Sequence, residues 1–123
     1  VFLKANQPYP VKSVVFPIRQ NSPLWRIYME RYEQNSPHQY HNGGIWPYVA
    51  GFWVMLLYRL KKTNLAWHEL ERFAEMNKIN NWEFNEWFHG CTHKPMGMVW
   101  QTWSASMYIY AYECVKKRKT PFF

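Results

Sequence analysis

The chain contains no aspartate, because all eight of its acidic residues are glutamate. Any reaction that needs an aspartate must therefore take it from outside these 123 residues. Cysteine is also scarce: Cys91 and Cys114 are too few for a disulfide scaffold. No signal-peptide pattern opens the chain. These two features favour a reducing compartment, so we expect a cytoplasmic location.

Long hydrophobic runs are missing as well. The longest apolar stretch covers residues 46–60 and contains Pro47 and Gly51. A membrane-spanning helix needs about 20 apolar residues, so we expect a buried helix here and no membrane partner. The chain starts at Val1 rather than at an initiator Met, and we expect it to be a piece of a longer protein.

The charge balance is basic, with a formal net charge of +7. Four of the cations form the run 116–119 near the C-terminus, where they suit the negative end of a helix dipole. No nucleic-acid motif accompanies them, so we expect no nucleic-acid partner. Hydrophobic residues make up 48% and charged residues 19% of the chain, a composition that predicts a packed domain rather than disorder.

Aromatic residues are in large surplus, at 20% of the chain and with eight Trp. Such a surplus is typical of a binding surface or an interface. The most informative stretch is WEFNEWFHG at residues 82–90, where Glu83 and Glu86 lie among four large rings. Carboxyl groups can move protons, and flat rings can stack on sugars while excluding water. On spacing alone, either glutamate is a candidate for either role.

The first third of the chain predicts little helix. Residues 1–45 hold five of the eight prolines, which indicates an extended, loop-rich lead-in. Within it, residues 11–18 could form a short strand. Residues 24–33 could form a helix with Ser22 as its N-cap and Pro23 at its first position, and residues 35–44 form a polar loop.

The remaining residues predict three longer helices, at 46–61, 64–77 and 100–117, separated by a long loop at 79–99. The first and last are apolar nearly all round and should be enclosed by other helices. The middle one is amphipathic, with Thr63 as its cap and Glu69, Glu71, Arg72 and Glu75 on its polar side. We therefore predict an all-α fold of about four helices, either a small bundle or part of an α/α toroid.

Three motifs occur in a fixed order along the chain. The first is HQYHNGGIWP at residues 38–47, the second is FNEWFHG at residues 84–90 followed by PMG at residues 95–97, and the third is QTWSA at residues 101–105. Together they resemble the (α/α)6-barrel glycoside hydrolases of the amylo-α-1,6-glucosidase (glycogen-debranching) and neutral/alkaline invertase group. The resemblance covers residues 14–115, at the C-terminal end of the barrel.

The resemblance implies that residues 1–123 are the C-terminal segment of an (α/α)6 catalytic domain. It also implies an inverting hydrolysis of α-glucosidic bonds, with Glu86 matching the general base and an upstream aspartate as the acid. An upstream aspartate is not part of this sequence, so this segment alone is not expected to catalyse hydrolysis. The base would activate a water on the face opposite the leaving group.

The motifs nominate further sugar-contacting residues, whose amide, phenol, imidazole and indole groups suit sugar hydroxyls and ring faces. They are Tyr40, His41, Asn42, Trp46, Trp87, His89, Gln101 and Trp103. The structural alternatives are a helix-entry turn, helix capping and core packing. His89 could instead orient Glu86. The alternation of His89, Cys91 and His93 lacks a second ligand pair, so we expect no metal and no cofactor.

The first hypothesis for function is thus the base-carrying part of a glycoside hydrolase in carbohydrate metabolism. Its substrate would be an oligosaccharide or glucan: an α-1,6-glucan, sucrose or another α-glucoside. Its partner would be the N-terminal part of the barrel or a second copy of the chain. The alternative is a non-catalytic carbohydrate-binding or interaction module derived from such a barrel.

Overall fold

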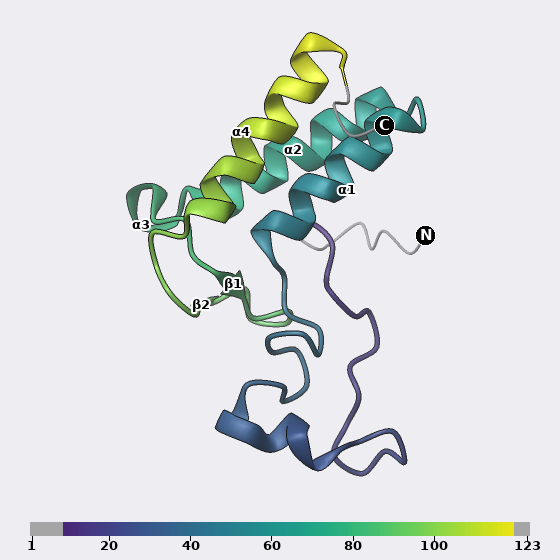
Figure 1. Cartoon of the computed structure of the whole chain (residues 1–123), viewed down its shortest axis with the longest axis vertical. Coiled ribbons are helices and arrows are strands. Elements are labelled where there is room, and N and C mark those ends of the chain that lie inside the picture. The colour runs from purple at the N-terminus through teal and green to yellow at the C-terminus, as the bar shows by residue number, and fades with distance from the viewer. Residues whose placement is uncertain (1–8, 120–123) are drawn as a thin grey trace.

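The computed structural model describes residues 9–119. Three long helices lie side by side at one end, and the lead-in extends away from them (Figure 1). In chain order the elements are η1 (Ile27–Glu33), α1 (Pro47–Arg59), α2 (Thr63–Asn77), α3 (Ile79–Trp82), β1 (Trp87–Phe88), β2 (Pro95–Met96) and α4 (Thr102–Lys117). The helices α1 and α4 pack on each other, and α2 packs against both.

Helix α1 starts where the sequence predicts. Trp46 is extended and Pro47 occupies the first turn, where a missing N–H costs no hydrogen bond. The helix ends at Arg59, because Lys61 adopts a left-handed φ of 60°. Gly51 brings α1 close to α4: a Cβ there would lie 3.0 Å from the carbonyl oxygen of Met107.

The core is formed by apolar side chains from the three long helices and from the loops beneath them. It consists of Ile45, Ala50, Val54, Met55, Leu57, Ala66, Leu70, Phe73, Met76, Phe88, Ala111, Cys114 and Val115. Helix α1 is not enclosed all round, however, because Phe52, Leu56 and Leu60 follow one another at i, i+4 and i+8 and are exposed. The prediction of a fully enclosed helix is wrong for this face of the described chain.

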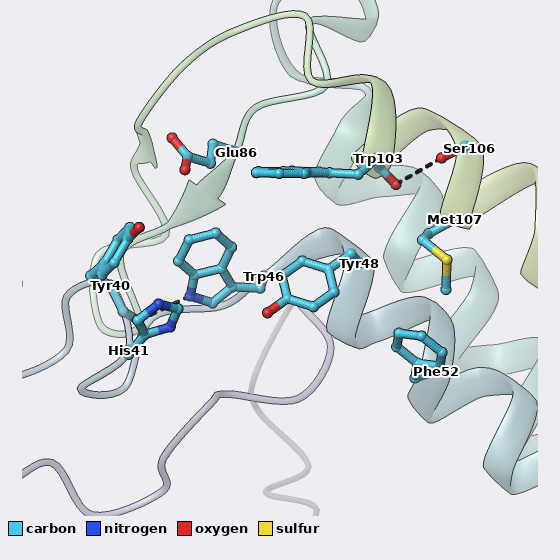
Figure 2. Close-up of a pocket in the computed structure, with 9 residues that line it drawn as sticks. All are labelled: Tyr40, His41, Trp46, Tyr48, Phe52, Glu86, Trp103, Ser106 and Met107. Carbon is cyan, nitrogen blue, oxygen red and sulfur yellow. Dashed lines mark hydrogen bonds between the residues drawn. The ribbon is translucent and has the colours of Figure 1, made fainter.

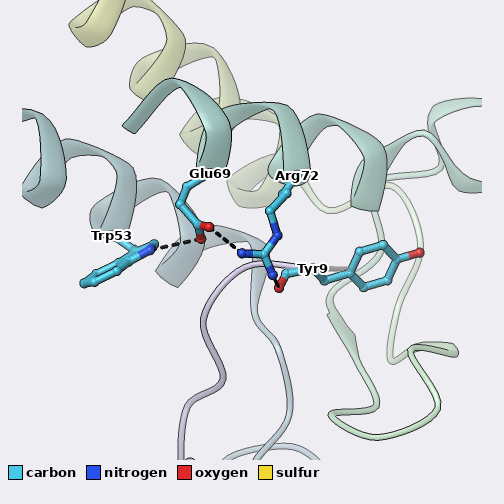
Figure 3. Close-up of polar contacts among 4 residues, drawn as sticks. All are labelled: Tyr9, Trp53, Glu69 and Arg72. Atoms are coloured by element: carbon cyan, nitrogen blue, oxygen red, sulfur yellow. Dashed lines mark hydrogen bonds and ion pairs between the residues drawn. The ribbon is translucent and has the colours of Figure 1, made fainter. Parts of the chain in front are cut away.

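Helix α2 differs from its prediction at two points. Thr63 is the first helical residue rather than a cap, and Lys62 precedes it without a side-chain capping bond. Glu69, expected on the polar side, is 1% exposed. Its carboxylate accepts hydrogen bonds from the Arg72 guanidinium and the Trp53 indole N–H, and Arg72 also donates to the backbone oxygen of Tyr9 (Figure 3). This network ties the lead-in to α2.

The segment from residue 79 to 99 is mostly loop, as predicted. The short helix α3 contains Asn80 and Asn81 with left-handed backbone angles, so it is a turn rather than a regular helix. Strands β1 and β2 form a two-residue antiparallel pair, with Trp87 opposite Met96 and Phe88 opposite Pro95. Helix α4 then ends where Arg118 turns left-handed, with φ of 56°.

The lead-in is loop-rich as expected, but two of its details are wrong. Residues 11–18 form no strand and make only an isolated bridge between Lys12 and Ile45. The predicted α-helix at 24–33 is replaced by the 3-10 helix η1, which starts after Arg26 and is kinked at Arg31 and Tyr32. Ser22 caps no helix and instead accepts the nearby Leu24 N–H in a local turn.

The all-α prediction is confirmed. Apart from the β1–β2 pair and isolated bridges, the regular secondary structure of residues 9–119 is helical, and the fold is consistent with a helical part of an α/α toroid. Among residues 9–119, none of the helices has both the length and the apolar character needed to cross a membrane.

The buried network predicts unequal stability effects along α2. Replacing Arg72 by Ala leaves the buried Glu69 without its ion-pair partner, which should lower the free energy of unfolding by about 3–5 kcal/mol. The matched control is Lys78→Ala, which removes the exposed Lys78–Glu75 pair of the same i, i+3 spacing and should cost under about 0.5 kcal/mol. Urea unfolding of both variants measures the difference, and equal losses would contradict this account.

Candidate active site

Two loops meet below the helices through backbone hydrogen bonds. The Ile45 N–H donates to the Phe88 oxygen at 2.9 Å, and the Phe88 N–H donates back to the Ile45 oxygen at 2.8 Å. A further bond of 2.8 Å joins the Gly90 N–H to the His38 oxygen. These bonds bring the first and second sequence motifs, more than forty positions apart in the chain, into one site.

A groove of about 460 Å³ lies at this junction. Its lining comes from the loop before α1 and from the first turns of α1 and α4, with one carboxylate among the rings. The lining residues are Tyr40, His41, Trp46, Tyr48, Phe52, Glu86, Trp103, Ser106 and Met107. Figure 2 shows Trp103 on one side of the groove and Trp46, Tyr48 and Phe52 on the other, with Glu86 toward the Tyr40 end.

Glu86 is half-buried and held by Met98 in two ways. Its N–H donates to the Met98 oxygen at 2.8 Å, and its Oε2 accepts the Met98 N–H at 3.0 Å. The backbone of Gly97, with φ of +72°, makes this possible, since a Cβ there would lie 2.4 Å from the same Oε2. One carboxylate oxygen is thus fixed by this backbone N–H.

The Tyr40 end of the groove is built from stacked rings. His41 stacks on the Trp46 indole at 4.8 Å with an interplanar angle of 12°, and Tyr40 meets Trp46 edge-on at 4.8 Å. The indole N–H of Trp46 donates to the backbone oxygen of Tyr40 at 3.1 Å. Trp46 is therefore fixed as a rigid wall, and His41 is the exposed side of the stack.

The structure brings five of the nine nominated residues together in the groove: Tyr40, His41, Trp46, Glu86 and Trp103. The other four lie outside its lining. Asn42 is buried, accepts the Ile18 N–H and donates to the oxygens of Ile18 and Asn35, so its amide pins the loop. Trp87 is buried in β1.

The remaining two also have local roles. Gln101 precedes α4 and makes the following bonds with its backbone. Its backbone N–H donates to the Phe84 oxygen, and its backbone oxygen accepts the N–H groups of Ser104 and Ala105. The Nδ1 of His89 accepts N–H groups within its own turn. Sugar contact by Asn42, Trp87, His89 and Gln101 stays a prediction.

The rings that face Glu86 are not its sequence neighbours. Trp82 and Phe84 pair with each other at 6.0 Å, outside the groove lining, and Trp87 and Phe88 are buried. Sequence reasoning missed Tyr48, Phe52, Ser106 and Met107. Helical spacing is the signal that could have found them: Phe52 follows Tyr48 by four positions, and Ser106 and Met107 follow Trp103 by three and four.

Glu86 is the only glutamate that lines the groove within residues 9–119. Glu83, its rival on spacing, accepts hydrogen bonds from the side-chain amides of Asn80 and Asn85. These bonds lower the pKa of Glu83 from its ordinary value, which favours its charged form. Across the described part of the chain, His, Cys and Glu side chains form no group of three or more placed to bind a metal ion.

Comparison with known proteins agrees with a helical part of an α/α toroid. A family model described as "Alkaline and neutral invertase" matches residues 6–118. The chain therefore belongs to the alkaline and neutral invertase family, a family of glycoside hydrolases in carbohydrate metabolism.

Individual relatives agree with the family match. "Alkaline/neutral invertase C, mitochondrial" of Arabidopsis thaliana is 25% identical over 116 residues, covering 94% of this chain and 17% of that protein. "Neutral/alkaline invertase 3, chloroplastic" of Oryza sativa subsp. japonica is 25% identical over 109 residues, covering 88% and 18%. The chain thus spans less than a fifth of the length of these relatives.

These matches correct two expectations. They support the invertase side of the predicted resemblance and give no support to the glycogen-debranching side. The expectation of a cytoplasmic location is wrong on this comparison, because the matched relatives are named mitochondrial or chloroplastic. It rested on cysteine scarcity and the missing signal-peptide pattern, neither of which distinguishes the cytoplasm from the interior of an organelle.

The contact between Gly97 and Glu86 predicts that Gly97→Ala displaces the carboxylate. The added Cβ clashes with Oε2, and a left-handed alanine is strained, so the free energy of unfolding should fall by about 1–3 kcal/mol. Urea unfolding measures the loss, and the NMR shift of the Met98 amide reports the broken bond. Gly97→Asn separates the two causes, because asparagine tolerates the left-handed angle but still carries a Cβ. An unchanged NMR shift of the Met98 amide in both variants would contradict the close contact of Gly97 with the Glu86 carboxylate.

Proposed function

We propose that this chain supplies the general base and part of the sugar-binding wall of an inverting glycoside hydrolase acting on α-glucosidic bonds. The observation that carries the proposal is the position of Glu86, which lines an aromatic groove. The chain also belongs to a family of glycoside hydrolases. The groove offers Tyr48 and Trp103 as flat surfaces for a sugar ring, and the buried Trp46 supports its wall behind His41. Such rings bind the apolar faces of sugars and exclude bulk water.

The chemistry assigned to Glu86 follows from its hydrogen bonds. The Met98 N–H occupies Oε2, which leaves Oε1 to accept a proton from a water molecule. That water attacks the anomeric carbon from the face opposite the leaving group, which inverts the configuration.

The general acid comes from outside the described residues in this proposal. Inverting enzymes place their two carboxyl groups about 6.5–9.5 Å apart, and Glu86 has no second carboxylate in its groove within residues 9–119. We propose that the acid lies on the helices that complete the toroid. Those helices would also cover the exposed stripe of Phe52, Leu56 and Leu60 on α1.

The substrate that we propose is sucrose or a related small α-glucoside. The matched relatives are named invertases, and sucrose carries an α-glucosidic bond. The groove volume of about 460 Å³ lies within the range of about 300–1,000 Å³ for small-molecule sites. An α-1,6-glucan is the less favoured alternative.

Replacing Glu86 by Gln in the enzyme that contains this segment should lower kcat for sucrose by at least about 10²-fold while leaving KM within a few-fold, because the amide keeps the shape but accepts no proton. Glu83→Gln is the matched control, since Glu83 lies three positions away and outside the groove; its kcat should stay near wild type. Steady-state kinetics with sucrose and with isomaltose measures both. Retained turnover by the Glu86 variant would refute the base assignment.

The absence of aspartate favours one second candidate, a carbohydrate-binding module without catalysis. On either reading, Trp103→Ala should weaken sugar binding by about 1–3 kcal/mol, by analogy with the cost of removing other aromatic stacking partners. Trp82→Ala is the control, because Trp82 is also partly exposed but lies outside the groove. Calorimetric titration with sucrose measures both variants. Binding without turnover in the complete protein would favour the module, and equal effects of the two variants would reject the groove as the sugar site.

A further inference from the structure

The turn between β1 and β2 is organised around one imidazole. The Nδ1 of His89 accepts two backbone N–H groups, from Cys91 and from Thr92, each at 3.1 Å. The same residue closes the turn with its backbone, since its N–H donates to the Lys94 oxygen at 2.9 Å and its oxygen accepts the His93 N–H at 2.9 Å. Four consecutive residues, 91–94, are thus hydrogen-bonded to His89.

The two bonds at Nδ1 require a neutral ring. A neutral imidazole carries its proton on one nitrogen and accepts with the other, whereas a charged one donates from both. With Nδ1 accepting, the proton of His89 belongs on Nε2. Protonation would place a hydrogen on Nδ1, facing the N–H groups of Cys91 and Thr92. A protonated Nδ1 accepts no hydrogen bond, so both bonds would break.

The surroundings of His89 oppose its protonation. The His38 ring lies 6.1 Å away, and its own buried Nδ1 has no hydrogen-bond partner. His93 packs edge-on against Tyr9. Burial lowers the pKa of His89, and His38, His93 and Lys12 lower it further.

The neighbouring imidazoles are biased in the same direction. Burial lowers the pKa of His38, with Lys12 and Arg19 adding to the effect. Burial lowers the pKa of His93, and Lys12 adds to it. The charged groups that act on the cluster, Lys12 and Arg19, are both cations, so each added proton meets repulsion.

The turn is connected to Glu86 through a short backbone ladder. Beyond the His89–Lys94 bond, Phe88 pairs with Pro95 and Trp87 with Met96. The ladder ends where the Glu86 N–H donates to the Met98 oxygen and the Met98 N–H donates to the Glu86 carboxylate. Loosening the turn therefore loosens the strand pair that positions the carboxylate.

We propose that His89 is a positioning residue for Glu86, and that it holds the loop that carries Glu86 in place only while its ring is neutral. This inference rests on the proposed function for its link to catalysis, because Glu86 is the base in that proposal. It assigns His89 no contact with the sugar. Acidification would charge His89, break its bonds to Cys91 and Thr92, and release the β1–β2 pair.

The direction of the pH effect follows from the lowered pKa. The unfolded chain binds a proton near the ordinary histidine pKa of about 6.5, and the folded turn binds it only at lower pH. The contribution of His89 to stability is therefore complete above about pH 6.5 and declines as the pH falls through the folded pKa.

The test is a pH titration of the 123-residue chain by NMR, which follows the His89 ring and the backbone amides together. The amides of Cys91, Thr92, Glu86 and Met98 should shift with the midpoint of the His89 ring. The variant His89→Asn keeps an acceptor at the Nδ1 position, as asparagine does in Asx turns, but does not titrate. It should keep the turn and lose this pH transition. His89→Ala should lose the turn at every pH.

The control is His68→Asn, which removes an exposed histidine on α2 and should leave the transition unchanged. The proposal is overturned if the Cys91 and Thr92 amides do not follow the His89 ring, or if His89→Asn retains the transition at Glu86 and Met98. In the enzyme that contains this segment, His89→Asn should also flatten the acid limb of the kcat/KM profile. If the enzyme that contains this segment shows no hydrolysis at all, the assignment of Glu86 as base is wrong. The NMR titration would still decide whether His89 positions Glu86.

Discussion

The reciprocal backbone bonds between Ile45 and Phe88 are the constraint on which the site depends. Both residues are fully buried, so the bonds are shielded from competing water. Ile45 leads directly into α1, and Phe88 belongs to β1, which directly follows Glu86. Through these two bonds, the rings at the start of α1 and the carboxylate of Glu86 are held in one geometry.

The loops of the site are positioned mainly by backbone groups and by small residues, and the packing of α1 on α4 adds the side chains of these two helices. Asn42 fixes the loop before α1 through three bonds to main-chain atoms of the lead-in. Gly97 leaves room for the carboxylate of Glu86 beside its own backbone. The start of α4 is attached to the same loop, because the Trp100 and Gln101 N–H groups donate to the oxygens of Glu83 and Phe84. The helices form most of the core, and loops and helix starts together line the groove.

Much of this could be predicted from the sequence where the signal is local. Pro47 marks the start of α1, and the apolar spacing gives three long helices near their observed bounds. Contacts between residues distant in the sequence could not be predicted. The inward turn of Glu69 depends on Arg72 and Trp53 meeting it from two helices, and the amphipathic pattern placed it outside. The stretch at 11–18 has strand-like residues, but its only bridge in the described chain joins Lys12 to Ile45, so no ladder forms.

The same limit applies to the groove. Sequence proximity suggested that the rings beside Glu86 would bind the sugar, yet a strand pair turns Trp87 and Phe88 into buried positions. The rings that face the carboxylate come instead from residues 40–52 and 103, which only the packing of α1 on α4 brings near. The motif order pointed to loops that contribute to the groove, while the choice of side chains that line it required the three-dimensional arrangement.

The central claim is that Glu86 occupies the place of the general base, on the face of the sugar opposite the leaving group. Azide rescue of Glu86→Ala in the enzyme that contains this segment tests it most directly, because azide can enter the space left by the side chain and attack the anomeric carbon without a base. With an α-glucoside as substrate, turnover should be lost without azide and restored with it, and the product should be the β-glucosyl azide. Hydrolysis that persists without azide, or an absence of any glucosyl azide alongside an intact fold, would contradict it.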